Sequence, residues 1–244
     1  MCSSFLVLAP ELGSAQSGTS LLPDLNPVAP SGPRPTAAGG RYYLTFSVRI
    51  DNNGTGPLTL RGARGSTAEP QMSVSQIVKV SDGTTTSVPN VGVFVYDAQY
   101  GRWGFQPYQV YELRRASDFG LVATGPDMNF CVNDYTNPSP RLPGEPTSPA
   151  YGCGSGRPTL LTLDEGISVG WANGHSAGRK GQLIDLTGVP AGSYILVHRV
   201  NPNNLLTEST LANNASSVRI TLSWQGTYPR VTLNRSCPET ETCA

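Results

Sequence analysis

RYYLTFSVRIDNNGTGPLTLRG (residues 41–62) decides the fold class of this 244-residue chain. Apolar and polar side chains alternate through its first half, and the apolar set is Leu44, Phe46, Val48 and Ile50. A period of two places all four on one face of a β-strand. The run DNNGTG (51–56) then supplies turn residues. The stretch therefore predicts a half-buried strand, a turn and the start of a second strand.

The same pattern continues on both sides of this stretch. SQIVKV (75–80) and VGVFVYD (91–97) predict a hairpin around SDGT (81–84), and GQLIDLTGVPAGSYILVHRVNP (181–202) predicts two strands around a turn. SSVRITLSW (216–224) adds another strand, and no long helical periodicity occurs. Many short strands at near-regular spacing predict an all-β, antiparallel β-sandwich with long Pro-rich loops. We expect one domain over residues 21–228, a leader over 1–20 and a C-terminal tail over 229–244.

Composition excludes several classes of function. Formal net charge is zero and charged residues make up 14% of the chain, which gives no electrostatic footprint for nucleic acid or a membrane surface. No segment has the ~20 apolar residues of a membrane span. The basic residues are fifteen Arg and only two Lys, Lys79 and Lys180. The N-terminal segment MCSSFLVLAPELGSAQSG resembles the end of a secretory signal, with a disordered leader as the alternative.

The five cysteines favour disulfides over a zinc site, because no CxxC pair occurs and the chain has only two His. We expect Cys131 to pair with Cys153 and Cys237 with Cys243, which fits an oxidising, extracytoplasmic compartment. Cys2 is left over, either as a lipid-anchor site or as part of a removed leader. The first pair brackets much of the Pro-rich loop 135–163, which is too long for an unconstrained loop in a compact domain.

Six stretches in order resemble the lysyl oxidase family in its bacterial, secreted form. They are LLPDL (21–25), YELR (111–114), NFCVND (129–134), GISVGW (166–171), GQLIDLTGVPAGSYIL (181–196) and VNPNNLLTESTLANN (200–214). The resemblance implies a copper-dependent amine oxidase. Its members hold Cu(II) with a His-x-His-x-His run before the YEL strand, which suits the preference of Cu(II) for imidazole. They also build a quinone by crosslinking a Lys to a Tyr.

The residues that carry that chemistry are not retained here. In YGRWGF (100–105) the framework residues Gly101, Trp103 and Phe105 match the family, but Tyr100, Arg102 and Gly104 stand at the three ligand positions. Arg is always protonated and cannot ligate a metal, and Gly has no side chain. The quinone-forming Lys and Tyr align with Asp127 and His175. We therefore expect neither copper nor quinone.

The resemblance also implies a structural calcium site. Asp24, Leu25 through its carbonyl, Glu208, Asn213 and Asn214 match it, and they offer the oxygen ligands that Ca²⁺ prefers. Thr210 replaces one of the family's Asp residues, which lowers the charge of the site. The alternative is that the same residues only cap turns.

Other residues have two interpretations each. His198 on a strand face is expected to be a hydrogen-bonded core or rim residue, and His175 to lie exposed in a Gly-rich turn. Asp97, Glu112, Asp127 and Asp134 are candidates for an acid–base cluster only if the fold brings them together. The aromatic hairpin either packs or forms a partner contact through Tyr100, Arg102, Trp103, Phe105 and Tyr108.

The function expected from these features is that of a secreted lysyl-oxidase-like protein that has lost amine oxidase activity. It would serve as a structural or partner-binding module of the cell envelope or an extracellular assembly, with a protein partner and no nucleic acid. One alternative is a working copper amine oxidase that acts on primary amines. Another is a calcium-stabilised adhesion-type β module, since such modules share the NPNNLLTES…NN ending.

Overall fold

The computed structural model describes residues 18–126, 128–138, 141–178 and 182–243, and every regular element among them is a β-strand. The strands are β1 (Ser20–Leu21), β2 (Leu25–Ala38), β3 (Arg41–Asn52), β4 (Leu58–Ala63), β5 (Gln71–Val80), β6 (Thr85–Asp97), β7 (Arg102–Gln106), β8 (Gln109–Arg115), β9 (Leu121–Thr124), β10 (Thr162–Ile167), β11 (Ala172–His175), β12 (Leu183–Asp185), β13 (Gly192–Val200), β14 (Ala215–Gln225) and β15 (Tyr228–Cys237). The predicted all-β fold class is confirmed.

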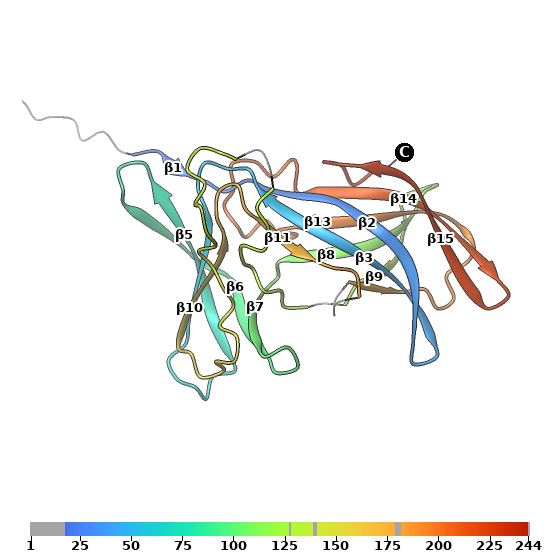
Figure 1. Cartoon of the computed structure of the whole chain (residues 1–244), viewed down its shortest axis with the longest axis horizontal. Coiled ribbons are helices and arrows are strands. Elements are labelled where there is room, and N and C mark those ends of the chain that lie inside the picture. Colours follow the sequence, from blue (N-terminus) through green and yellow to red (C-terminus); the bar gives the residue numbers. More distant parts are fainter. Residues whose placement is uncertain (1–17, 127, 139–140, 179–181, 244) are drawn as a thin grey trace, which may run out of the picture.

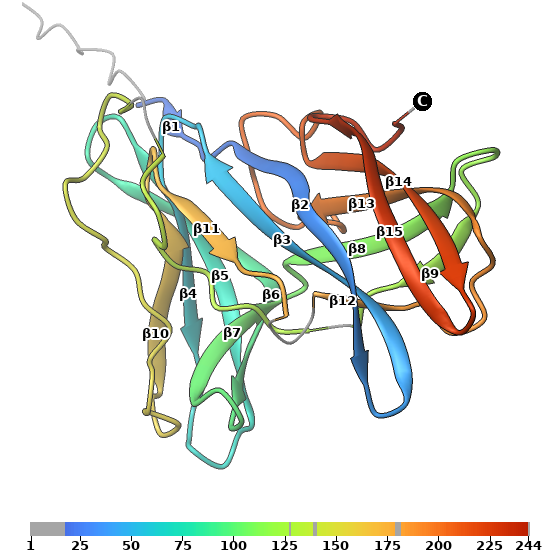
Figure 2. The same cartoon turned by 45° about the vertical axis from the view of Figure 1, so that its right-hand side comes forward.

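The strands form three antiparallel sheets (Figures 1 and 2). Sheet A has the order β10-β4-β5-β6-β7, with β1 paired to β5. Sheet B places β3 between β2 on one side and β11 and β12 on the other. Sheet C has the order β15-β14-β13-β8-β9. Sheet B lies between the other two in Figure 2, and its strand β2 contacts β13, β14 and β15 of sheet C.

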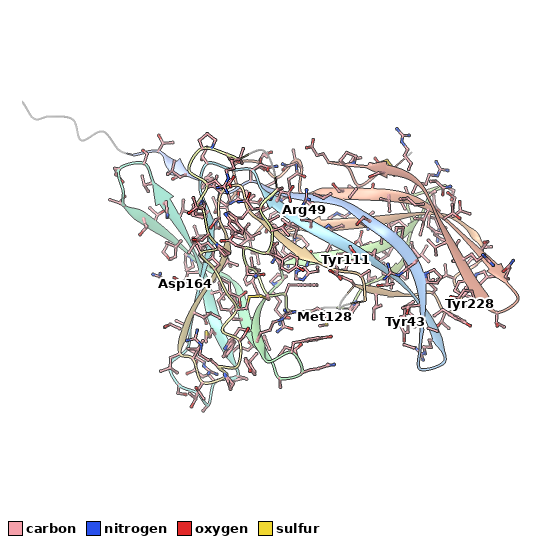
Figure 3. The ribbon with its side chains drawn as sticks, in the orientation of Figure 1. Tyr43, Arg49, Tyr111, Met128, Asp164 and Tyr228 are labelled. Carbon is pink, nitrogen blue, oxygen red and sulfur yellow. A yellow bond between two sulfur atoms is a disulfide. The ribbon has the colours of Figure 1, made fainter. Side chains whose placement is uncertain are left out.

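One hydrophobic core joins the three sheets. The apolar residues of the 41–62 stretch lie in it as expected: Leu44, Phe46 and Ile50 are fully buried and Val48 is 6% exposed. The ring of Phe46 meets that of Tyr111 on β8 edge to face, with centroids 5.0 Å apart. Figure 3 shows Tyr111 in the central part of the molecule.

The C-terminal segment differs from the expected tail. Residues 228–237 form β15 and pair with β14 from Gln225 to Ser217. The register shifts between Arg219 and Ile220, so one strand carries an extra residue at that point. This bulge interrupts the alternation of apolar and polar residues, which is why the pattern did not predict a strand.

Both expected disulfides are present, Cys131–Cys153 and Cys237–Cys243, each with Cα atoms 5.6 Å apart. Cys2 lies outside the described residues. The loop that follows Cys131 is held at further points: Asp134 accepts hydrogen bonds from the backbone of Ala150 and Ser168 at 2.8 and 2.7 Å. The Arg64 guanidinium donates to the carbonyls of Pro158 and Leu160 at 2.6 and 2.8 Å. The described residues of the loop before β10 are therefore held in place by these bonds although they form no strand.

Candidate functional site

The hairpin between β6 and β7 carries Tyr100, Arg102 and Gly104, the three positions that the sequence analysis compared with copper ligands. Asp97 at the end of β6 pairs in register with Arg102 at the start of β7. The Asp97 carboxylate accepts the backbone N–H groups of Gln99 and Tyr100 at 2.9 and 3.2 Å. Gly101 has φ of 62°, a conformation that favours glycine. Local turn chemistry therefore shapes the hairpin.

The aromatic residues of the hairpin face the core. Trp103, Phe105 and Tyr108 are 1%, 0% and 1% exposed. The Trp103 indole donates to the carbonyl of Arg157 at 3.0 Å, and its ring lies 5.4 Å from that of Tyr96. These three residues cannot form a partner contact in this fold, so the packing interpretation is the one that the structure supports. The predicted contact surface is reduced to Tyr100, which is 42% exposed, and the half-buried Arg102.

Tyr100 and Arg102 line a small hollow together with His175. Its other lining residues are Asp97, Trp103, Met128, Asn129 and Phe130. The fold thus brings together positions 100, 102 and 175, which the sequence analysis placed in two separate motifs, and Asp127 lies outside the described residues. The hollow has a volume of about 10 Å³, at the limit for one water molecule. The Arg102 guanidinium lies over the ring of Tyr100, 5.4 Å from its centroid.

Gly104 is closed off by the backbone of Phe130. A Cβ atom at Gly104 would lie 2.9 Å from the Phe130 carbonyl carbon and 3.0 Å from its nitrogen and oxygen. Phe130 is fixed there, because Phe105 and Phe130 exchange backbone hydrogen bonds of 2.7 and 3.0 Å. The position that aligns with the third copper ligand therefore has no room for a side chain.

His175 is buried rather than exposed, which corrects the expectation for this residue. It ends β11, which pairs with β3, and it is 7% exposed. Its Nε2 lies 2.9 Å from Oδ1 of Asn173, and its ring lies 5.3 Å from that of Phe130. The sequence ANGHS has no alternation to predict a strand, because the two Gly-rich turns around it dominate the pattern.

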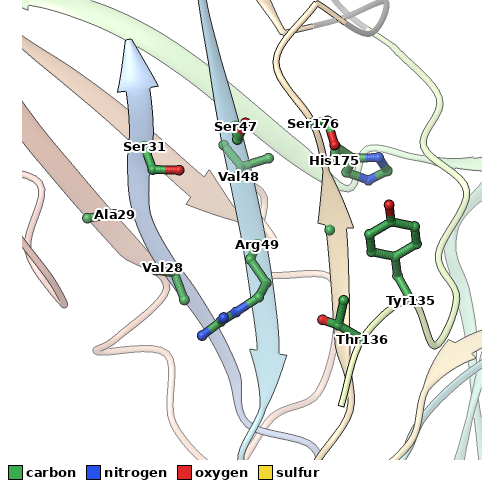
Figure 4. Close-up of a pocket in the computed structure, with 11 residues that line it drawn as sticks. Val28, Ala29, Ser31, Ser47, Val48, Arg49, Tyr135, Thr136, His175 and Ser176 are labelled. Carbon is green, nitrogen blue, oxygen red and sulfur yellow. The ribbon is translucent and has the colours of Figure 1, made fainter. Parts of the chain in front are cut away.

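On its other side His175 borders an open groove (Figure 4). The groove has a volume of about 250 Å³ and lies over β2, β3 and β11. Figure 4 shows the rings of His175 and Tyr135 on the same side of β11, with Arg49 further along β3. Arg49 is paired with Asp51 at 2.6 Å. His175 therefore lines both this groove and the small hollow under the hairpin.

A buried carboxyl that sequence reasoning missed lies near the hollow. Glu165 of β10 is fully buried, its Oε2 accepts the Val132 N–H at 2.9 Å, and its Oε1 has no hydrogen-bond partner among the described residues. Burial raises the pKa of Glu165 well above its usual range, and the positive charge of Arg102 partly opposes that shift. Sequence reasoning missed Glu165 because the surrounding residues LDEGIS (163–168) have the polarity of an exposed turn. Only the fold shows that its carboxyl is buried.

The proposed acid–base cluster does not form among the described residues. Asp97 caps the hairpin and Asp134 holds the long loop. Glu112 accepts hydrogen bonds from Arg114 and Arg199 at 2.8 and 2.5 Å on sheet C, and these bonds lower its pKa against the effect of burial. Three of the four carboxylates thus have separate structural partners, and Asp127 lies outside the described residues.

The five residues of the expected calcium site do come together. Glu208 accepts the Leu25 N–H at 2.9 Å and the side-chain amide of Asn214 at 2.8 Å. The amide of Asn213 donates to Asp24 at 2.9 Å. The Oδ1 atoms of Asn213 and Asn214 are buried and have no hydrogen-bond partner within the described part of the chain. Burial raises the pKa of Glu208 to about 7, against the lowering effect of its hydrogen bonds.

This cluster contains oxygen atoms of the kind that Ca²⁺ prefers. Two carboxylates and two unsatisfied amide oxygens lie within one cluster, and unsatisfied buried polar atoms are costly. Thr210, where the family has an Asp, is exposed, and its hydroxyl accepts the Ala212 N–H at 3.2 Å. Across the described ranges no group of three or more His, Cys, Asp or Glu side chains could hold a metal. His198 is fully buried and its Nε2 lies 2.7 Å from Oε1 of Gln109, so its predicted core role is confirmed.

Fold and site together define an all-β protein with three antiparallel sheets, two disulfides and a small hollow under the β6–β7 hairpin. The profile of the family described as Lysyl oxidase matches residues 99–234, more than half of the chain. The chain belongs to the lysyl oxidase family. In the part of the chain that the structure describes, no helix is long and apolar enough to cross a membrane.

Curated relatives match up to half of the chain. Lysyl oxidase homolog 1 of Homo sapiens is 32% identical over 122 residues, which cover 50% of this chain and 19% of that protein. Protein-lysine 6-oxidase of Gallus gallus is 35% identical over 104 residues, 43% of this chain and 22% of that protein. The enzyme of the same name from Sus scrofa is 34% identical over 116 residues, 48% of this chain and 41% of that protein. The chain thus spans less than half the length of these relatives.

Proposed function

We propose that this protein is a non-catalytic member of the lysyl oxidase family that acts outside the cytoplasm as a structural or partner-binding module. The observation that carries the proposal is the closure of Gly104 by the Phe130 backbone, 2.9 Å from where a Cβ would lie. A lost ligand can be replaced by a neighbour, but a site with no space for a third side chain cannot rebuild a three-imidazole set.

The donor chemistry of the other positions supports the same conclusion. Arg102 is cationic and cannot coordinate a metal, and its guanidinium covers Tyr100. The residues present do not fit copper, so we derive no step through it. His175 is held by Asn173 at the position that aligns with the quinone-forming Tyr. Lys79 lies on β5 in sheet A, and neither it nor Lys180, which is outside the described residues, aligns with the family's Lys.

Metal analysis of the purified full chain tests this proposal directly. The protein is loaded with excess Cu(II) and dialysed, and copper per chain is measured together with a quinone redox stain and amine-dependent peroxide release. We expect substoichiometric copper, no stain and no peroxide. Stoichiometric copper with a positive stain would establish the alternative, a copper-dependent amine oxidase acting on primary amines.

The binding role is supported by the exposed part of the hairpin. Tyr100 projects from the turn with Arg102 against its ring, and the described part of the 135–163 loop is fixed beside them through the Trp103–Arg157 hydrogen bond. A rigid surface loses little conformational entropy on binding. A crosslinking pull-down from the envelope or secreted fraction with Tyr100→Ala tests it, with Tyr228→Ala as a control for an equally exposed Tyr on sheet C. Equal capture of the partner by both variants would exclude the hairpin as the contact surface.

An extracytoplasmic location is supported by the two disulfides, which persist in oxidising compartments. Thiol labelling of the native protein, without reduction, should leave Cys131, Cys153, Cys237 and Cys243 unlabelled. Labelling of all four in freshly lysed cells would place the protein in a reducing compartment. A lipid anchor through Cys2 remains a separate prediction.

Structural calcium is a second proposal, favoured by the orphaned Oδ1 atoms of Asn213 and Asn214. Asp24, Glu208, Asn213 and Asn214 would hold the ion, and Ca²⁺ would supply the positive charge that the two carboxylates lack. Such an ion stabilises the fold without chemistry and would suit an adhesion-type β module. Millimolar Ca²⁺ should raise Tm while Mg²⁺ has a smaller effect, and Glu208→Gln should abolish the shift. No shift in the wild-type chain would leave the residues as turn caps.

A further inference from the structure

The outer face of sheet C concentrates arginine in a chain of zero net charge. Arg114 of β8, Ile195 of β13, Arg219 of β14 and Arg235 of β15 are successive cross-strand neighbours and form one row across four strands. Arg219 and Arg235 stand directly opposite each other. Like charges directly opposite each other repel across a sheet, so this pair concentrates positive charge on the face.

Arg219 has no carboxylate partner among the described residues. Its Nε donates to the hydroxyl of Ser193 on the neighbouring strand β13 at 3.1 Å, which orients the guanidinium. Arg114, by contrast, is bound to Glu112 at 2.8 Å and lies over the ring of Phe119. The charge of Arg219 on β14 is therefore not neutralised by an acidic side chain among the described residues.

A groove of about 390 Å³ begins at Arg219. It runs between the turn after β8 and the turn before β13, and Arg115 lies on its other side. Ser117 and Ser193 line it with hydroxyls, and Pro190 and Tyr194 with apolar surface. Arg115 is paired with Asp118 at 2.9 Å, but both side chains are at least half exposed, and such pairs contribute little. Arg115 can therefore exchange this partner for an anion at little cost.

From this arrangement we infer an anion-binding site for an acidic polysaccharide, centred on Arg219 and extended by Arg115 and Arg235. Guanidinium groups bind carboxylate and sulfate groups in bidentate geometry. The hydroxyl-lined groove suits sugar rings, and Arg235 on the next strand supplies a second charge for a repeating polymer. Tyr194 is 4% exposed, so the groove offers no ring on which a nucleobase could stack.

The site is independent of the proposed loss of oxidase activity, because its contacts lie on sheet C and its test uses neither copper nor amine. It goes beyond the proposed binding role at the hairpin, because it assigns a second site, on sheet C, to another class of ligand. Failure to bind polysaccharide would leave the copper result unchanged, and copper in the hairpin would leave this site unaffected.

Binding of three polymers by the full chain tests the inference. Polygalacturonate carries carboxylates, dextran sulfate carries sulfates, and dextran is neutral; immobilised polymers are titrated at low and at physiological ionic strength. We expect binding to at least one anionic polymer, weakening with salt, and none to dextran. The preferred polymer distinguishes carboxylate from sulfate recognition.

The variant Arg219→Gln/Arg235→Gln should lose about tenfold or more in affinity, since charge-assisted hydrogen bonds are removed at two positions. Arg34→Gln/Arg61→Gln is the matched control, because it removes the same charge from β2 and β4. Arg115→Gln, at the exposed edge, provides a second test if the double variant does not fold. Equal weakening by test and control variants, no binding by the wild type, or tighter binding of single-stranded DNA than of either polysaccharide would each overturn the inference.

Discussion

The Phe130 carbonyl carbon lies 2.9 Å from the point that a Cβ atom of Gly104 would occupy, and this contact between two backbones closes the hairpin. Real Cβ atoms do not approach main-chain carbon so closely, and the backbone of Phe130 is fixed by its hydrogen bonds to Phe105. A protein interior is packed as densely as an organic crystal, so an added Cβ atom would displace its neighbours instead of fitting between them.

Gly104→Ala is therefore expected to lower the free energy of unfolding by about 1–3 kcal/mol, the usual cost of overpacking. Thermal or denaturant unfolding measures it. Gly152→Ala is the control, since Gly152 is exposed and a Cβ there would have no atom within 4 Å. An Ala variant at 104 as stable as the control would contradict the closed hairpin.

Restoring two imidazoles should not restore the metal centre. Tyr100→His/Arg102→His supplies two ligands on one hairpin, but the third position stays closed by Phe130. We expect copper to remain substoichiometric after dialysis and the quinone stain to remain negative. One tightly held copper per chain in this variant would show that the hairpin can open.

His198 should make stability fall in mild acid. Burial lowers the pKa of His198 from 6.5 to about 3, so the unfolded chain takes up a proton that the folded chain refuses. Its contribution is lost as pH falls from about 6.5 towards 3, and at pH 5 the loss is up to about 2 kcal/mol.

His198→Gln keeps a donor for Gln109 and removes the titration. We expect the wild type to lose up to about 2 kcal/mol more than this variant between pH 7 and pH 5, measured by denaturant unfolding. Parallel pH profiles of the two proteins would show that His198 titrates normally or is accessible to water.

The two disulfides should differ in their contribution to stability. Their cysteines are separated by 22 and by 6 residues, and the chain-entropy relation gives about 3.4 and about 2.4 kcal/mol for such loops. Cys131→Ala/Cys153→Ala should therefore destabilise more than Cys237→Ala/Cys243→Ala. Hydrogen exchange should rise in the 141–161 segment of the first variant only, and the reverse order of stabilities would contradict the entropic account.

Thr210→Asp should tighten calcium binding, because it adds a carboxylate at the position where the family resemblance implies an Asp ligand. Calorimetric titration with Ca²⁺ measures the change, and the affinity should rise by about tenfold, as expected for one added charged ligand. Asn203→Asp, an exposed change in the same loop, is the control for charge alone. Equal gains in both variants would exclude a direct ligand role.

The sequence was sufficient for elements whose periodicity is uninterrupted. The alternation from Leu44 to Ile50 predicted β3 and its buried face, and cysteine placement predicted both disulfides. The bulge at Arg219/Ile220 hid β15, and flanking glycines hid the burial of His175 on β11. Periodicity indicates which face of a strand is apolar. The burial of a residue also depends on which distant segment packs on that face.

The candidate site was likewise predictable from the sequence only in part. Motif comparison identified positions 100, 102, 104 and 175, but it could not show that three of them line one hollow. It also could not show that Trp103, Phe105 and Tyr108 are inside, because an exposed aromatic hairpin and a packed one have the same letters. Glu165 was missed because its burial is produced by the segment around Val132, far away in sequence.

Backbone hydrogen bonds also connect the hairpin to the 135–163 loop. The Trp103 N–H donates to the carbonyl of Cys153 at 3.0 Å, and the Gly156 N–H donates to that of Gly101 at 2.7 Å. Cys153 is itself crosslinked to Cys131 on the segment that leads from Phe130. These bonds involve only main chain and a disulfide, so residues 100 and 102 can be exchanged without dismantling the turn. Such a hairpin can lose one chemistry and acquire another through single substitutions, since its shape is maintained by main-chain bonds and a disulfide that do not use the side chains at 100 and 102.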